Sequence, residues 1–84
     1  MQTELIHVGF ENYLALNRVV AIAAPSAAPI KRVVQRGKEE GRCIDCTSGR
    51  RTKAAVVLDN DLVVLIAIAP ETFAGRVEAL RGGS

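Results

Sequence analysis

Residues 53–69 read KAAVVLDNDLVVLIAIA, and this stretch decides the fold. Two aliphatic runs, 53–58 and 62–69, flank the triplet Asp59-Asn60-Asp61, whose short polar side chains favour a tight turn. The longer run is far below the roughly 20 residues that a transmembrane helix requires. We therefore predict that the two runs form a β-hairpin.

The segment before the hairpin predicts an amphipathic helix. Apolar residues recur at i, i+3, i+4 and i+7 from Ile30 to Gly37, and cations occupy the opposite face. Ser26 can cap this helix, and Pro29 fits its first turn, where the missing N–H costs nothing. Gly41 supplies the stop at the other end.

The remaining segments predict three more strands and a second helix. Residues 5–10, 13–23 and 43–46 are rich in apolar and β-branched residues and are predicted strands. The second helix begins at Pro70, and residues 81–84 form a flexible tail. The order ββαβββα predicts an α+β fold, with a small mixed or antiparallel sheet of about five strands and two short helices packed on it.

The composition indicates one domain that associates with itself. With 84 residues, the chain forms a single domain, 1–84. Apolar residues make up 49% of the chain and aromatic residues only 4%. More aliphatic surface than a small core can hide usually meets another subunit. Residues 1–4 carry an acid and no cationic region, so we predict no secretory signal and expect a cytoplasmic homo-oligomer that does not enter a membrane.

Positive charge is concentrated in the middle of the chain. Residues 18–53 hold nine cations and three acids, whereas residues 1–17 and 54–84 each carry a net charge of −2. This basic segment is the candidate electrostatic footprint for nucleic acid. A solvated helix face with ordinary loop cations gives the same pattern, so both interpretations stay open.

Arg18 breaks the pattern of the predicted strand 13–23. Side chains alternate between the two faces of a strand, and the other even-numbered positions of this segment are apolar. An unpaired guanidinium is not stable in an apolar interior. Either a bulge at Asn17 shifts the alternation and leaves Arg18 in solvent, or Arg18 reaches a subunit seam or a ligand.

Two further pairs of cations are candidate nucleic-acid contacts. Arg50 and Arg51 lie in a predicted loop, and the planar guanidinium fork suits phosphate oxygens and guanine edges. Lys31 and Arg32 lie on the polar face of the first helix, where they could follow a phosphate backbone. Both features are also common on protein surfaces. The few aromatic residues disfavour a surface that stacks single-stranded bases.

The two cysteines predict no metal site. Cys43 and Cys46, together with the distant His7, fall short of the about four ligands that zinc needs. Positions i and i+3 of a strand point to opposite faces, so we interpret the pair as core cysteines. The sequence shows no catalytic triad, convergent carboxylates or phosphate-binding glycine loop. We therefore expect no enzyme, metal, cofactor or small-molecule substrate.

Four short motifs follow one another along the chain: NRVVAI at 17–22, SAAPIKR at 26–32, ID and GRRT within 44–52, and PET at 70–72. Each alone is weak, but in this order they resemble the RemA family of bacterial extracellular-matrix regulatory proteins. The resemblance covers residues 6–80. The cysteine pair is not part of the family pattern, which supports its interpretation as core cysteines.

The resemblance implies a regulator of the transcription of matrix (biofilm) and related genes that binds double-stranded DNA. It also implies a ring-shaped homo-oligomer of subunits with a fold similar to LytTR DNA-binding domains. The positions that match family residues implicated in DNA binding or activity are Arg18, Pro29, Arg50 and Arg51, with Lys31 and Arg32 in a matching block. Pro29 is expected to act indirectly, by fixing the helix start that presents the two cations after it.

Besides a redox or zinc protein that uses Cys43 and Cys46, which would require stoichiometric zinc, one alternative function stays open. The acidic flanks could pair with the basic middle of the next subunit in a structural or scaffold ring whose partner is a protein. The arginines would then lie at subunit seams. Binding through DNA phosphates weakens steeply with salt, whereas a hydrophobic ring does not, so salt dependence separates the two functions.

Overall fold

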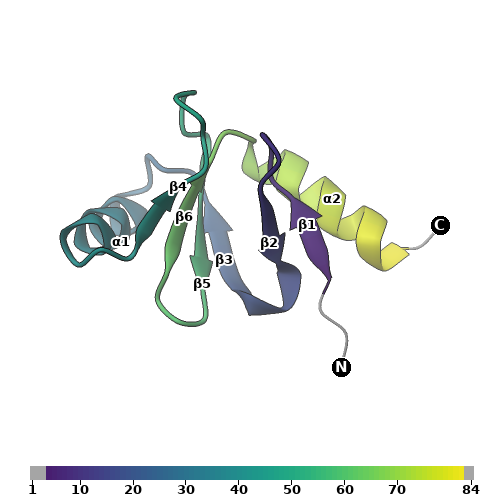
Figure 1. Cartoon of the computed structure of the whole chain (residues 1–84), viewed down its shortest axis with the longest axis horizontal. Coiled ribbons are helices and arrows are strands. Elements are labelled where there is room, and N and C mark those ends of the chain that lie inside the picture. Colours follow the sequence, from purple (N-terminus) through teal and green to yellow (C-terminus); the bar gives the residue numbers. More distant parts are fainter. Residues whose placement is uncertain (1–3, 83–84) are drawn as a thin grey trace.

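A mixed four-stranded sheet forms the middle of the molecule (Figure 1). The computed structural model describes residues 4–82. The strands lie in the order β3 (Val19–Ala23), β5 (Ala54–Leu58), β6 (Val63–Ile66) and β4 (Cys43–Asp45). β5 pairs antiparallel with both β3 and β6, while β4 pairs parallel with β6. The predicted α+β class and the mixed sheet are therefore confirmed.

The predicted hairpin is confirmed as β5 and β6. Ala54 pairs with Ile66 at its open end, and near the turn the amide of Leu58 donates to the carbonyl oxygen of Leu62 at 2.9 Å. β6 ends before the predicted residue 69, because β5 begins opposite Ile66 and offers no further partner.

The prediction of a single strand over 13–23 is wrong. The chain instead forms β2 (Tyr13–Ala15), the 3-10 turn η1 (Leu16–Arg18) and then β3. β2 pairs antiparallel with β1 (Leu5–His7) in a separate two-stranded sheet, so six strands form two sheets. The first residues of η1 and of β3 pack against the same apolar cluster, and positions i and i+3 of a straight strand cannot do this.

The same turn accounts for Arg18. A break of the alternation at Asn17 is observed, as a turn rather than a bulge, and Arg18 lies exposed instead of on an apolar face. An exposed Arg18 is also accessible to a ligand or a second subunit, so that alternative stays a prediction. β1 is also shorter than predicted. It stops before Phe10, because residues 9–11 adopt positive φ angles and turn the chain into β2.

The first predicted helix is α1 (Ala28–Glu39). Pro29 lies in its first turn, as predicted. The helix ends two residues before Gly41, whose φ of +73° is easily adopted only by glycine. The predicted cap is wrong, because Ala27 occupies the N-cap position without a side-chain hydrogen bond and Ser26 lies one residue outside it.

The second helix, α2 (Pro70–Gly82), begins at the predicted proline. The predicted tail 81–84 is wrong at its first two residues, which are helical, and residues 83–84 lie outside the described part of the chain. Within residues 4–82, neither helix is long and apolar enough to cross a membrane.

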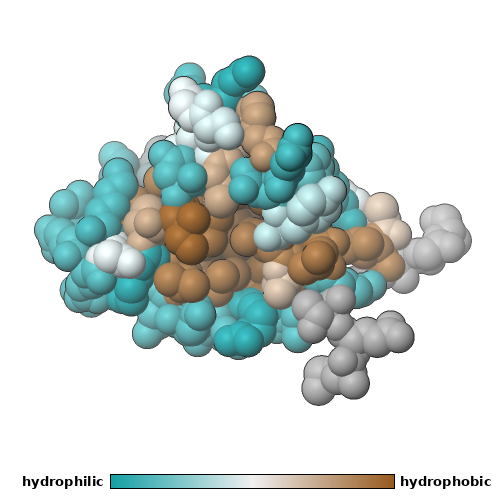
Figure 2. All heavy atoms as spheres, viewed as in Figure 1, coloured by the Kyte–Doolittle hydropathy of each residue, from teal (hydrophilic) through white to brown (hydrophobic). Residues whose placement is uncertain are grey.

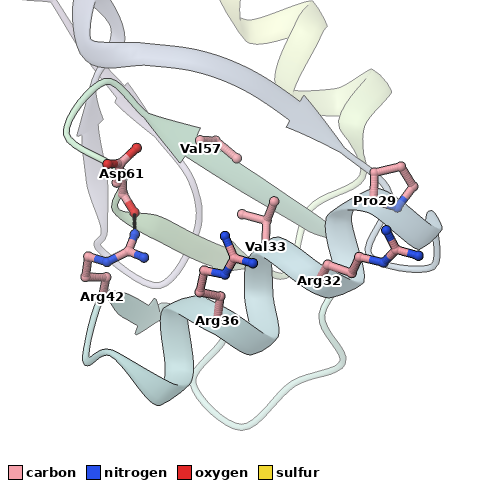
Figure 3. Close-up of a pocket in the computed structure, with 7 residues that line it drawn as sticks. All are labelled: Pro29, Arg32, Val33, Arg36, Arg42, Val57 and Asp61. Atoms are coloured by element: carbon pink, nitrogen blue, oxygen red, sulfur yellow. Dashed lines mark hydrogen bonds between the residues drawn. The ribbon is translucent and has the colours of Figure 1, made fainter.

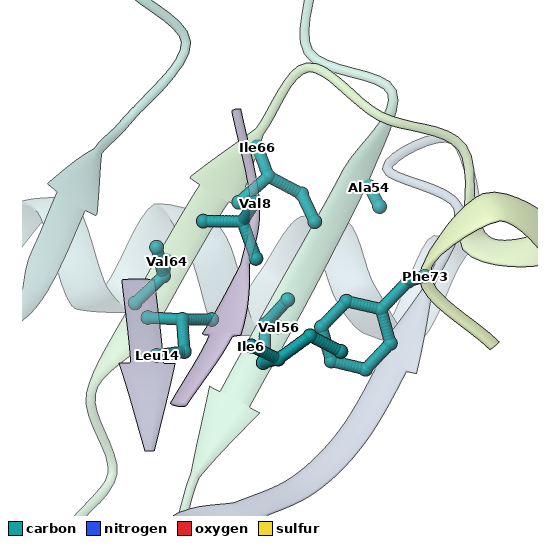
Figure 4. Close-up of a cluster of buried hydrophobic side chains, with 8 residues drawn as sticks. All are labelled: Ile6, Val8, Leu14, Ala54, Val56, Val64, Ile66 and Phe73. Carbon is teal, nitrogen blue, oxygen red and sulfur yellow. The ribbon is translucent and has the colours of Figure 1, made fainter. Parts of the chain in front are cut away.

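The core occupies both faces of the four-stranded sheet. On one face, the β1–β2 hairpin and α2 cover the main cluster (Figure 4). Its buried members are Ile6, Val8, Leu14, Ala54, Val56, Val64, Ile66 and Phe73. On the other face, Ile30 and Val34 of α1 pack against Ala55, Val63 and Leu65. The chain thus forms three layers, with the sheet in the middle.

The layer formed by α1 is incomplete. α1 packs on β4 and β6, while Val57 of β5 stays half-buried and Val20 of β3 is 65% exposed. Figure 2 shows apolar side chains gathered across the middle of one side of the molecule, beside the hydrophilic side chains of α1. The exposed large apolar residues of the described chain are Leu5, Phe10, Tyr13, Val20, Val33, Ile44 and Leu80.

Candidate nucleic-acid interface

A loop between β4 and β5 stands out from one end of the sheet (Figure 1) and carries the two adjacent arginines. Its first turn is held by Thr47, whose amide and hydroxyl both donate to Oδ1 of Asp45, at 2.9 and 2.6 Å. The amide of Arg50 then donates to the carbonyl oxygen of Thr47 at 3.0 Å. Gly49 has a φ of +79°, in the left-handed region. Local hydrogen bonds therefore define the loop that presents Arg50 and Arg51.

Asp45→Asn is expected to lower the free energy of unfolding at neutral pH. The two hydrogen bonds from Thr47 hold the pKa of Asp45 below its ordinary value. A carboxyl with a lowered pKa in the folded state stabilises the fold above its ordinary pKa, and this contribution is lost as the pH falls through the folded-state pKa. Denaturation of both proteins from about pH 7 down to about pH 3 measures the difference, which should narrow toward the acid end.

The matched control is Asp61→Asn, because that carboxylate accepts no hydrogen bond within residues 4–82. If the difference between wild type and Asp45→Asn stays constant with pH, the hydrogen bonds to Thr47 do not stabilise the loop in this way.

Arg50 rests on an aromatic ring. Its Cζ lies 5.1 Å from the centroid of the Phe10 ring, within the range of a cation–π contact. The side-chain amide of Asn12 donates to the carbonyl oxygens of Gly9, Phe10 and Cys46, at 3.1, 3.2 and 3.4 Å. These bonds join the turn at 9–12 to the end of β4. Phe10 was not a predicted site residue, because nothing local in the sequence links it to Arg50.

Arg51 and Lys31 line adjoining hollows. Arg51 is exposed and borders one hollow with Ser26 and Lys53, and Lys31 borders a second. Pro25 and Thr52 line both. The structure therefore places Lys31 on the side of α1 that faces the loop.

Pro29 and Arg32 line a different groove, on the side of α1 that faces β5 (Figure 3). Arg36, which was not a predicted site residue, lines it as well. Arg32 and Lys31 also share a shallow hollow along the helix. The cations of α1 therefore line a series of hollows from the side of the helix that faces the loop to the side that faces β5.

Arg18 lies at the other end of the molecule. Its Nε donates to both carboxylate oxygens of Asp59, at 2.8 and 2.9 Å, and the Asp59 amide donates to the carbonyl oxygen of Arg18 at 2.9 Å. Asp59 comes directly after the last residue of β5, whereas Arg51 lies in the loop before the first residue of β5. Five extended residues span roughly 16 Å, so one subunit does not bring Arg18 together with Arg50 and Arg51.

The cysteines pack on opposite faces of the sheet, as predicted. Cys43 contacts the cluster under α1 and Cys46 contacts the main cluster, and both are free thiols. Burial raises the pKa of each thiol above its ordinary value, which keeps it protonated at neutral pH. The His7 ring lies 5.1 Å from that of Tyr13. No cluster of His, Cys, Asp or Glu able to hold a metal ion occurs in residues 4–82.

Comparison with known proteins adds independent information. A family model described as "RemA-like: Extracellular matrix regulatory protein A-like" matches residues 5–77. A protein of Dehalococcoides mccartyi strain BAV1, named "Putative regulatory protein", is 52% identical over 84 residues, which is all of this chain and 88% of that protein. Proteins with the same description from Thermoanaerobacter sp. strain X514 and Clostridium acetobutylicum are 47% and 45% identical, covering 94% and 100% of this chain and 82% and 91% of theirs. These names indicate a regulatory protein rather than an enzyme.

Proposed function

Because this chain belongs to the RemA-like family of regulatory proteins, we propose that it regulates transcription by binding double-stranded DNA as a ring-shaped homo-oligomer. In this proposal it acts in the cytoplasm on extracellular-matrix (biofilm) and related genes, and its subunit is LytTR-like. Repeated contacts from Arg18, Arg50 and Arg51, with support from Lys31 and Arg32, bind the duplex.

The observation that supports DNA binding most directly is the loop between β4 and β5. It stands out from the sheet, and its two arginines are exposed. The ion pairs of the described residues are Arg18–Asp59 and Arg42–Glu40, so neither Arg50 nor Arg51 is neutralised by a carboxylate there. Two unpaired guanidinium groups on a fixed loop suit phosphate oxygens.

A ring suits this surface, because each subunit offers only a few phosphate contacts. Such a subunit alone binds DNA at non-specific strength. Linked copies raise the effective concentration of each later contact, provided that the DNA bends to meet them. In the proposed ring, Arg18 and the loop contact different stretches of the duplex, since they lie at opposite ends of β5. The exposed apolar side chains described above supply surface for the subunit seams.

The proposal is tested by fluorescence anisotropy of a labelled AT-rich intergenic duplex at two salt concentrations, with the mass of the free protein measured by light scattering. Saturable binding that weakens steeply with salt, by an oligomer, is the expected result. Absence of binding at low salt would refute DNA binding and favour a scaffold ring. A monomer that binds DNA would refute the ring but not the binding of DNA.

Arg18→Ala is expected to weaken duplex binding about tenfold, since each subunit then lacks one charge-assisted hydrogen bond to phosphate. The free energy of unfolding should change by less than about 1 kcal/mol, because ion pairs between exposed side chains contribute little, and Arg18 and Asp59 are 52% and 46% exposed. Anisotropy and denaturation measure the two effects. Dissociation of the oligomer by this substitution would place Arg18 at a subunit seam instead.

A further inference from the structure

A groove beside α1 shares no lining residue with the loop between β4 and β5. It has a volume of about 510 Å³ and lies where α1 leaves part of the sheet uncovered (Figure 3). It is lined by Pro29, Arg32, Val33, Arg36, Arg42, Val57 and Asp61. Volumes of about 300–1,000 Å³ are typical of sites for small organic ligands.

The positive charge of this groove is only partly compensated. Arg42 donates to the Glu40 carboxylate and to the carbonyl oxygen of Asp61, which offset its charge and fix its position. Arg32 and Arg36 lie four residues apart on α1, and neither takes part in an ion pair of the described residues. Like charges at this spacing are close neighbours on a helix and repel each other. An anion held between them would relieve the repulsion.

Apart from the four charged residues, which include the Asp61 carboxylate beside Arg42, the groove is apolar. Val57 comes from the uncovered part of the sheet, and Val33 lies between the two arginines on the groove side of α1 (Figure 3). Pro29 closes the end near the start of the helix. A ligand that fits both parts needs an anionic group beside a flat or apolar body.

We propose that this groove binds a nucleotide unit. Its phosphate lies between the guanidinium groups of Arg32 and Arg36, whose planar forks match phosphate oxygens, and its base lies against Val33 and Val57. A free nucleotide and a nucleotide of a DNA strand share this chemistry. The site goes beyond the proposed DNA-binding loop, because none of its lining residues belongs to that loop, and it shares only Arg32 with the proposed duplex contacts.

Isothermal titration of the full chain with AMP and with inorganic phosphate tests the site. We expect one AMP per chain, binding at least tenfold more tightly than inorganic phosphate because the base contacts the apolar floor. Arg36→Ala should weaken AMP binding at least tenfold. The matched control is Lys38→Ala, which removes a charge from the same helix at a position that lines the hollow facing the loop. Equal losses of affinity in the two variants, or no saturable binding of AMP, would overturn the proposal.

Duplex titrations distinguish the two sources of the nucleotide. If Arg36→Ala also weakens duplex binding and AMP competes with the duplex, the groove holds a nucleotide of the DNA. If Arg36→Ala weakens the binding of AMP but leaves duplex binding unchanged, the ligand is a free nucleotide. AMP binding by an Arg50→Ala/Arg51→Ala variant that no longer binds DNA would support the groove independently of the loop. A change in oligomer size on Arg36→Ala, with no AMP binding by wild type, would assign the groove to a contact between copies and overturn the proposal.

Discussion

Arg50→Ala/Arg51→Ala is expected to reduce the affinity for duplex DNA at least a hundredfold at low salt. Removing one cation that neutralises a phosphate lowers the slope of log affinity against log salt by about 0.9, so the double variant reduces this slope by about 2 for every subunit that engages the DNA. The linked subunits of the proposed ring multiply the effect on affinity, because each weakened subunit also lowers the probability that the next one binds. Anisotropy over a series of salt concentrations measures both quantities.

The control for this experiment is Arg76→Ala, compared with Arg50→Ala and Arg51→Ala as single variants that remove the same charge. Arg76 lies in α2, which covers the face of the sheet opposite α1, and it does not belong to the loop, so its removal should leave the salt slope unchanged and change the affinity by less than about twofold. Size-exclusion chromatography should show unchanged oligomers for all variants. Collapse of Arg50→Ala to monomers would make this arginine an assembly residue and contradict the proposed role in DNA binding.

Phe73→Ala is expected to lower the free energy of unfolding by about 3–5 kcal/mol, the usual cost of removing a buried aromatic side chain. Phe73 is 3% exposed and belongs to the cluster that α2 shares with the β1–β2 hairpin and the sheet. A domain of this size has a total stability of about 5–15 kcal/mol, so the variant loses much of it. Chemical denaturation at one fixed protein concentration measures the change, because self-association shifts apparent stability.

Thr72→Ala serves as the control for Phe73→Ala, since it lies next to it in α2 and is exposed. Its effect should stay within about 0.5 kcal/mol. Equal effects of the two substitutions would show that α2 does not stabilise the sheet through its apolar side chain.

Local sequence signals were sufficient to predict the elements that begin or end at a residue with a strong conformational preference. The turn at Asp59-Asn60-Asp61, the helix start at Pro70 and the stop at Gly41 all occur where the sequence predicts them. The break at η1 could not be predicted in this way. The alternation of apolar residues up to Leu16 is the same whether the strand continues or the chain turns there. What decides the break is packing against distant residues of the main cluster, which no local pattern contains.

The candidate site shows the same division. The exposed loop with Arg50 and Arg51 is visible in the sequence, since Gly49 marks its turn. The cation–π pair of Arg50 and Phe10 joins residues 40 positions apart and becomes visible only in the fold. The groove that Arg36 lines exists because α1 covers only one half of the sheet. The helical periodicity of the sequence does not indicate which half α1 covers.

The irregular pairing of β3 has a consequence for the proposed association of copies of this chain. β3 is an edge strand of the sheet, and its register with β5 shifts between Val19 and Ala21. A flat edge with unpaired amides and carbonyls is a template for open-ended fibre growth, and a bulge twists the edge so that a second strand cannot align along it. At the opposite edge, β4 is only three residues long. In the proposed oligomer, copies of this chain would therefore meet through side chains, which allows closed assemblies and disfavours amyloid-like stacking.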